Sequence, residues 1–275
     1  MNAVLDAMEN GTISRRVWFY ANYHCNLECS YCLTESSPRA PRRQLDHSLM
    51  KSLTRQAADL GFTEVGVTGG ETFLDLALPA TLAEMSESVP VIVLTNGTLF
   101  AGDRLERLAP MLGRQISMQI SLDSANPDLN DMARGPENFA KVVESIPRLI
   151  NAGHRVRIAS TGQAPDEESQ EALCTLHRSL GISDDDHVVR PIVRRGRGAT
   201  FDGSVPAGPD ELFPELTITA DGAFWSPFAP TVSNDHVDTD LLVSRTVEPL
   251  SVPAQRLVAL AQGRPVGSDV ANNIR

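Results

Sequence analysis

Three cysteines lie in one short segment, Cys25-Asn-Leu-Glu-Cys29-Ser-Tyr-Cys32, and the chain has only four cysteines among its 275 residues. Clustered cysteines of this kind indicate metal ligation and not a disulfide framework. Three thiolates can hold three corners of a four-iron cluster. Because the fourth iron would stay open to a ligand that reacts, the segment predicts chemistry at the metal and not structural bracing.

A structural zinc site is the alternative interpretation of this segment, with His24 or Cys174 as the fourth ligand. Structural zinc sites take four protein ligands, usually in recognisable pairs. This sequence has one group of three cysteines and no second Cys-x2-Cys pair, which favours the iron cluster.

Short apolar runs alternate with longer amphipathic runs, a pattern that predicts repeated β/α units with parallel strands and right-handed crossovers. We expect strands at 17–23, 64–68, 91–95, 116–121, 155–160 and 187–192. We expect helices between them at 46–60, 76–88, 101–112, 137–152 and 166–180, with Asp46 as the cap of the first and Gly61 at its end.

Residues able to do chemistry follow the ends of these strands: the cysteine segment, Gly69-Gly70-Glu71, Asn96-Gly97, Ser121 to Asp123, and 194–198. In a (β/α) barrel the carboxyl ends of the strands carry the active site. The predicted fold class is therefore α/β, a partial (β/α)6 TIM-like barrel over 1–198. An extension over 199–275 follows, with a short β-hairpin around Asp221-Gly222, an irregular stretch and a last helix at 253–262.

The net charge and the hydropathy pattern disfavour nucleic acids and membranes as partners of this chain. The chain has 24 Lys and Arg against 35 Asp and Glu, a net charge of -11. Phosphates would be repelled, so neither a nucleic acid nor an anionic membrane is the expected partner. We find no signal-peptide pattern and no apolar run long enough to span a bilayer, and we expect a cytoplasmic protein.

The cysteine spacing after the first strand, with Gly69-Gly70-Glu71 after the second, resembles the radical S-adenosylmethionine (SAM) superfamily. Thr95-Asn96-Gly97 and Ser121-Leu122-Asp123, after the third and fourth strands, are also similar to that family. The resemblance covers residues 15–198. It implies an enzyme in which a reduced [4Fe-4S] cluster cleaves SAM, and the resulting 5′-deoxyadenosyl radical takes hydrogen from a small-molecule or peptide substrate.

The resemblance also implies site residues. The cluster ligands would be Cys25, Cys29 and Cys32, and the cofactor-binding residues would be Tyr31 near the adenine, Gly69, Gly70 and Glu71 at the amino group, Asn96, and Ser121 and Arg134 at the ribose and carboxylate. A carboxylate suits a guanidinium fork, and glycines let the backbone approach a ligand closely. Structural roles stay open: core burial for Tyr31, a strand end for Ser121 and a surface ion pair for Arg134.

The extension departs from the family pattern. Many relatives carry further cysteines there for auxiliary clusters, yet no cysteine follows Cys174. The resemblance then implies a C-terminal extension without an auxiliary cluster, a redox-neutral outcome and a flavodoxin- or ferredoxin-type electron donor. We expect Phe224, Trp225 and Phe228 to close the barrel as a hydrophobic plug, with a wall of the substrate pocket as the alternative.

Two further features have open roles. Cys174 could give a hydrogen atom to a substrate radical, although its helix is expected outside the barrel and burial is the preferred interpretation. Among Arg190, Arg194, Arg195 and Arg197, we expect most to be solvated or paired with 184–186. The alternative role for these arginines is to bind the carboxylate of SAM or an anionic substrate. Arg190 is the one that we expect to point inward.

The alternative function is a degenerate barrel that binds a cluster or SAM and acts as a regulatory or delivery module. The three cysteines and Glu71 argue against it.

Overall fold

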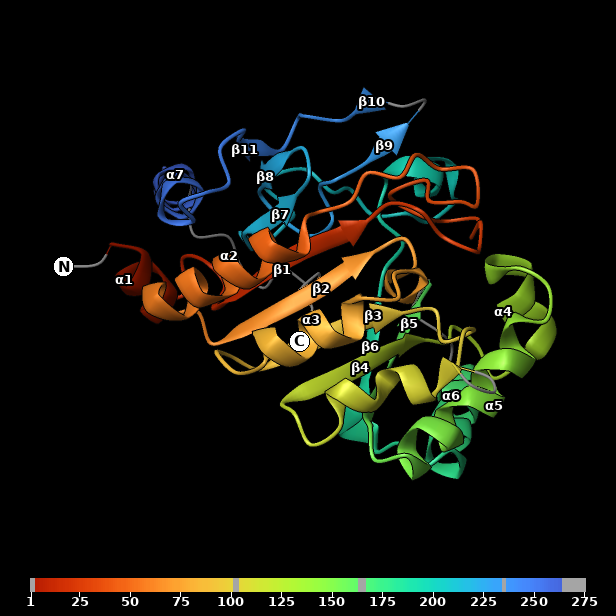
Figure 1. Ribbon diagram of the computed structural model, residues 1–275. Helices are drawn as coiled ribbons and strands as arrows, with labels where there is room; N and C mark the ends of the chain where they lie inside the picture. The colour runs from red at the N-terminus through yellow and green to blue at the C-terminus, as the bar shows by residue number, and fades with distance from the viewer. Residues whose placement is uncertain (1–2, 101–103, 163–166, 234–235, 264–275) are drawn as a thin grey trace.

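The computed structural model describes residues 3–100, 104–162, 167–233 and 236–263. Its centre is a run of parallel strands that are neighbours in chain order: β1 (Arg16–Asn22), β2 (Glu64–Gly69), β3 (Val91–Thr95), β4 (Ile116–Ser121), β5 (Arg155–Thr161) and β6 (His187–Arg190) (Figure 1). The predicted fold class, a partial (β/α)6 barrel, is confirmed.

Helices cover the outer face of these strands (Figure 1): α2 (His47–Leu60), α3 (Leu78–Met85), α5 (Asn138–Asn151) and α6 (Glu167–Ser179). In α2 the Asp46 side chain accepts a hydrogen bond from the Leu49 N–H at 3.0 Å, and Gly61 ends the helix at φ 97°. Both residues do what the sequence predicts, because an aspartate satisfies the free N–H groups and glycine tolerates the left-handed turn.

The region after β3 differs from expectation. The predicted helix at 101–112 is a short 3₁₀ helix, η3 (Glu106–Met111), and residues 101–103 lie outside the described part. Pro110 lies inside it and lacks the N–H that an α-helix needs.

Two helices were not expected, α1 (Ala3–Glu9) and α4 (Pro127–Arg134). The signals for α4 are nevertheless in the sequence. The Asn126 side chain accepts from the N–H groups of Asp128 and Leu129, Pro127 is the first helical residue, and Gly135 follows the last. Proline at the start and glycine past the end are the usual limits of a helix.

The extension adds strands to the same sheet. The hairpin at Asp221-Gly222 is confirmed as β7 (Thr217–Thr219) and β8 (Gly222–Phe224), and β7 runs parallel to β1. The remaining elements are β9 (Val232–Ser233), β10 (His236–Val237), β11 (Leu242–Ser244), α7 (Ser251–Gln262) and the 3₁₀ turns η1 (Thr72–Leu74), η4 (Asp184–Asp186) and η5 (Gly196–Thr200). The division into two domains at residue 198 stays a prediction.

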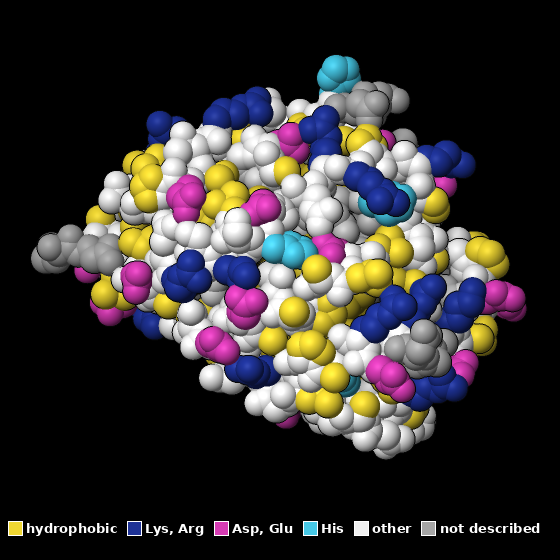
Figure 2. Space-filling model, in the orientation of Figure 1, with side chains coloured by type: hydrophobic (Ala, Val, Ile, Leu, Met, Phe, Trp, Pro, Cys, Tyr) yellow, Lys and Arg dark blue, Asp and Glu magenta, His cyan; other side chains and the backbone are white. Residues whose placement is uncertain are grey.

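Basic and acidic side chains are interspersed on the face that Figure 2 shows, so charge of one sign does not dominate this face. None of the helices described here has the length and apolar character needed to cross a bilayer.

Candidate active site

The three cysteine side chains line one cavity at the carboxyl ends of the strands. Tyr31, Gly69, Gly70, Asn96, Ser121 and Arg134 line the same cavity, together with Tyr20, Thr161, Arg190 and Phe228. The strands therefore bring together nearly all the predicted site residues from five separate stretches of chain, as parallel strands of a barrel do.

Each cysteine sulfur contacts a polar neighbour, which for Cys29 is the Arg134 carbonyl oxygen at 3.8 Å. The Leu27 N–H lies 3.3 Å from the Cys25 sulfur, and the Thr34 hydroxyl lies 3.3 Å from the Cys32 sulfur. Burial, with the Glu71 carboxylate second, raises the pKa of Cys25 to about 12. Thiolates at this place therefore need a positive partner, and metal binding supplies one while displacing the thiol proton.

The donor set fits an iron–sulfur cluster. In the described part of the chain, no three His, Cys, Asp or Glu side chains converge closely enough to hold one metal ion. The three thiols instead line a shared cavity, an arrangement in which each sulfur could bind a different iron.

The Gly69-Gly70 turn packs directly against the chain leaving β1. A Cβ at residue 70 would lie 2.2 Å from the His24 carbonyl oxygen, so only glycine fits. The Gly70 N–H donates to the Asn22 carbonyl oxygen at 3.0 Å. This close approach lets the backbone of the second loop form part of the cavity wall.

Glu71 is fully buried, and its carboxylate is used by the protein itself. One oxygen accepts from the Phe73 N–H at 3.0 Å and the Thr95 hydroxyl at 2.7 Å, and the other accepts from the Asn96 N–H at 2.7 Å. Glu71 therefore ties the loop after β2 to the loop after β3. Its predicted contact with the SAM amino group stays a prediction, since the two glycines line the cavity and Glu71 does not.

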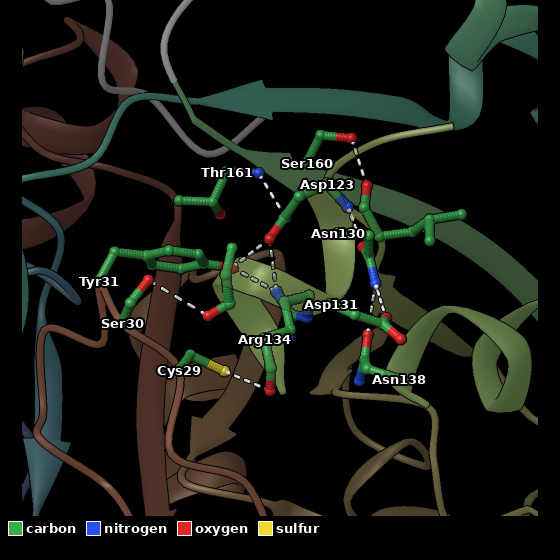
Figure 3. Close-up of polar contacts among 12 residues, drawn as sticks. Cys29, Ser30, Tyr31, Asp123, Asn130, Asp131, Arg134, Asn138, Ser160 and Thr161 are labelled. Atoms are coloured by element: carbon green, nitrogen blue, oxygen red, sulfur yellow. Dashed lines mark hydrogen bonds and ion pairs between the residues drawn. The ribbon is translucent and has the colours of Figure 1, made fainter. Parts of the chain in front are cut away.

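Tyr31, Asp123 and Arg134 form a buried polar triad (Figure 3). The Tyr31 hydroxyl donates to Asp123 Oδ2 at 2.5 Å, and Arg134 Nη1 donates to the Tyr31 oxygen and lies 3.2 Å from the same carboxylate oxygen. The other carboxylate oxygen accepts from the Thr161 N–H at 2.9 Å. Burial raises the pKa of the Tyr31 phenol, which therefore keeps the proton that it donates.

Asp123 is the residue that sequence reasoning missed, although it closes the Ser121-Leu122-Asp123 motif. The surface ion pair considered for Arg134 is wrong, because its side chain is only 6% exposed. Arg134 is brought to the cysteine loop by α4, whose Ala133 carbonyl oxygen accepts from the Ser30 N–H at 2.9 Å.

The arginine-rich segment after β6 clamps the cysteine loop. Arg197 donates from Nε to the Cys29 carbonyl oxygen and from Nη2 to the Ser36 carbonyl oxygen, each at 2.7 Å. Arg195 is paired with Asp238 and Asp240. The expectation of solvated side chains or of pairing with 184–186 is thus wrong for these two arginines. Arg197 bonds to the cysteine loop instead, and Arg195 bonds to two aspartates of the extension.

Two other predictions concern the edge of the site. Cys174 is not brought to the cavity: it lies half-buried on α6, outside the strands, so this placement gives no support to its predicted role as hydrogen donor. The three aromatic residues expected to form the plug, Phe224, Trp225 and Phe228, are all buried in the core, and Phe228 also lines the cavity.

Comparison with known proteins decides the family. The family profile described as Radical SAM superfamily matches residues 21–173, more than half of the chain. The chain belongs to the radical SAM superfamily. The predicted family is thereby confirmed, and membership implies a [4Fe-4S] cluster and SAM as the cofactors of this site.

Two curated relatives match about half of the chain. The antilisterial bacteriocin subtilosin biosynthesis protein AlbA of Bacillus subtilis is 34% identical over 143 residues, which are 51% of this chain and 32% of AlbA. The mycofactocin maturase MftC of Mycolicibacterium smegmatis is 31% identical over 153 residues, 53% of this chain and 37% of MftC. The chain therefore spans about a third of the length of these relatives.

Solved structures share the fold. Native anSMEcpe with bound AdoMet and Cp18Cys peptide has a TM-score of 0.62 at 12% identity, over 90% of this chain and 82% of that one. Streptococcus suis SuiB bound to precursor peptide SuiA has a TM-score of 0.58 at 19% identity, over 76% of this chain and 46% of SuiB. At these identities the likeness shows the fold alone.

Proposed function

We propose that this chain is a radical SAM enzyme that modifies a peptide. The observation that carries the proposal is that three thiols, a glycine backbone turn and the polar residues Ser121 and Arg134 all line one cavity at the barrel mouth. When bound, the reduced cluster and SAM supply a 5′-deoxyadenosyl radical, which takes a hydrogen atom from the substrate.

The protein's own residues would divide the work. Cys25, Cys29 and Cys32 would hold the cluster and leave one iron open for the amino and carboxylate groups of SAM. The Gly69-Gly70 backbone offers close polar contact to the amino group, and Ser121 and Arg134 offer it to the ribose and carboxylate. Asn96 belongs to the same wall.

Tyr31 is proposed to stack on or beside the adenine. Its hydroxyl is fixed by Asp123 and Arg134, so the ring has one orientation in the cavity. Tyr20 and Phe228 line the cavity as well, and such apolar surfaces exclude the water that would otherwise quench a reactive radical.

A peptide is the favoured substrate class because two fold relatives were solved with peptides, SuiB with its precursor peptide and anSMEcpe with Cp18Cys peptide. We propose a redox-neutral outcome, since residues 199–275 contain no cysteine that could hold an auxiliary cluster as electron acceptor. A flavodoxin or ferredoxin is the proposed electron donor.

A nucleotide substrate is a second candidate. The GTP 3′,8-cyclase of Haemophilus ducreyi is 30% identical over 139 residues, 48% of this chain and 39% of that enzyme. A regulatory module that binds SAM without cleaving it is the remaining alternative.

The test is substrate-dependent formation of 5′-deoxyadenosine by anaerobically reconstituted protein, with pools of synthetic peptides and with GTP in parallel. We expect peptide pools, and not GTP, to raise the rate of 5′-deoxyadenosine formation. The peptide products should exchange hydrogen for deuterium and keep the same number of hydrogen atoms, as a redox-neutral reaction requires. Stimulation by GTP alone would favour the nucleotide candidate. SAM that binds but is never cleaved under strong reductant would favour the regulatory module.

A further inference from the structure

Arg190 is a half-buried cation that lines the cavity, and its side chain has no partner among the residues that the structure describes. It ends β6 and lines the cavity beside Tyr20 and Phe228. Its Nε and Nη2 atoms are buried and make no hydrogen bond within the described residues. Nor does any carboxylate of the described residues lie within ion-pair distance of its guanidinium.

The charged groups around Arg190 already have partners, so its unpaired guanidinium differs from theirs. Glu215 is the carboxylate whose charge acts on it, but Glu215 is already bonded to Ser14 at 3.1 Å and paired with Arg16 at 3.7 Å. The other cavity arginine, Arg134, is neutralised by Asp123. A buried charge without a partner is costly, so its persistence indicates a ligand that supplies the opposite charge.

Gln119 is a second buried polar group without a partner, and it lies on the same inner face. It is two residues before Ser121 on β4, so its side chain points to the side on which Ser121 lines the cavity. It is 1% exposed, and neither its Oε1 nor its Nε2 has a hydrogen-bond partner among the described residues. In the sheet Gln119 is opposite Arg157 of β5, whose charge acts on Arg190.

We propose that Arg190 binds a carboxylate of the substrate inside the barrel, with Gln119 as a further polar contact below it. This proposal rests on the proposed function, and it deepens it by naming the chemistry of the group that enters: an acidic side chain or the carboxyl terminus of a peptide. A guanidinium offers a planar fork of N–H donors that a carboxylate satisfies with two parallel hydrogen bonds.

The experiment measures binding without turnover, so that its failure is separate from a failure of catalysis. Reconstituted protein with SAM is titrated with small capped probes, and binding is followed by saturation-transfer NMR. N-acetyl-glutamate N-methylamide is compared with its glutamine isostere for the side-chain source. N-acetyl-alanine is compared with N-acetyl-alanine amide for the terminal source.

We expect one carboxylate probe to bind at least about tenfold more tightly than its amide partner, as charge-assisted hydrogen bonds imply. The preference should vanish in Arg190→Gln and persist in the matched control Arg194→Gln, since the Arg194 side chain donates to the Ser204 carbonyl oxygen at 3.0 Å and does not line the cavity. Equal binding of both probes, or a preference kept in Arg190→Gln, would overturn the proposal.

Gln119→Met is a second variant, which tests the proposal without a substitution at residue 190. Replacing an unpartnered buried amide by an apolar side chain of similar shape should leave the fold as stable or more stable. The substitution should weaken binding of the carboxylate probe by about threefold or more. A variant that binds the probe as the parent does, or that unfolds, would contradict this part.

SAM itself is the competing source of a carboxylate, and the same proteins distinguish it. We expect Arg190→Gln to bind SAM with the affinity of the parent protein, measured by equilibrium dialysis. A loss of SAM affinity in Arg190→Gln would assign the guanidinium to the cofactor and overturn the substrate role. Absence of 5′-deoxyadenosine from the parent protein would refute the proposed function while leaving the probe result standing.

Discussion

Asp123 and Arg134 form a buried ion pair that joins the end of β4 to the end of α4, with side chains only 7% and 6% exposed. The pair holds the hydroxyl of Tyr31 between them, so it also fixes the cysteine loop (Figure 3). Three separate parts of the chain therefore depend on one carboxylate.

Asp123→Asn is predicted to destabilise the metal-free chain by about 3 kcal/mol, because it leaves Arg134 buried without its counter-charge. Urea unfolding measures the change. Glu144→Gln is the matched control: it breaks the pair with Arg148, whose side chains are 60% and 45% exposed, and should cost less than about 0.5 kcal/mol. Equal effects of the two substitutions would show that the buried pair is not special.

Cys29→Ala is predicted to abolish the visible absorbance and to remove most of the iron, about four atoms per chain in the parent protein. Cys174→Ala should keep both, because Cys174 lies on α6 and does not line the cavity. Iron and sulfide analysis after anaerobic reconstitution checks this. A cluster lost from Cys174→Ala would place that thiol among the ligands.

Arg197→Lys is predicted to make the cluster about tenfold more sensitive to a chelator without unfolding the barrel. Arg197 bridges the carbonyl oxygens of Cys29 and Ser36 with two different nitrogens, and the single ammonium of lysine cannot keep both bonds. The rate of absorbance loss in excess chelator is the measurement. Arg194→Lys should behave as the parent protein does, and equal loss from both variants would refute the clamp.

Acid should destabilise the fold through His177. Burial, with His187 second, lowers the pKa of His177 from 6.5 to about 4. Between these values the unfolded chain binds a proton that the folded chain refuses, so the stability present above pH 6.5 is lost as the pH falls towards 4. At pH 5 this amounts to about 1–2 kcal/mol.

The measurement is the urea midpoint of metal-free protein at neutral pH and at mildly acidic pH. His177→Phe should lose part of the pH dependence, whereas the exposed His236→Gln should keep it. A pH dependence unchanged in His177→Phe would show that other groups cause it.

Much of the fold followed from the sequence because two periodicities alternate along it. All six strands and the caps of α2 are where the pattern puts them. The failures have local causes: Pro110 turned a predicted helix into a 3₁₀ segment, and the short α4 was missed although Asn126, Pro127 and Gly135 mark its limits.

The site could be predicted in part because its residues follow consecutive strands, which fixes their common edge. What the sequence could not show is which groups satisfy one another. Asp123 was seen only as part of a motif, yet it is the partner of both Tyr31 and Arg134. Arg195 is paired with residues more than forty positions away, a distance at which local pattern carries no information.

The central claim is that three sulfur ligands at the barrel mouth leave one iron free to bind SAM and cleave it. The direct measurement is 5′-deoxyadenosine formed by anaerobically reconstituted protein with SAM and dithionite. We predict a brown protein that forms 5′-deoxyadenosine, and formation that stops in Cys29→Ala and persists in Cys174→Ala. A colourless protein with tightly bound zinc, or a brown one that never cleaves SAM, would contradict the account.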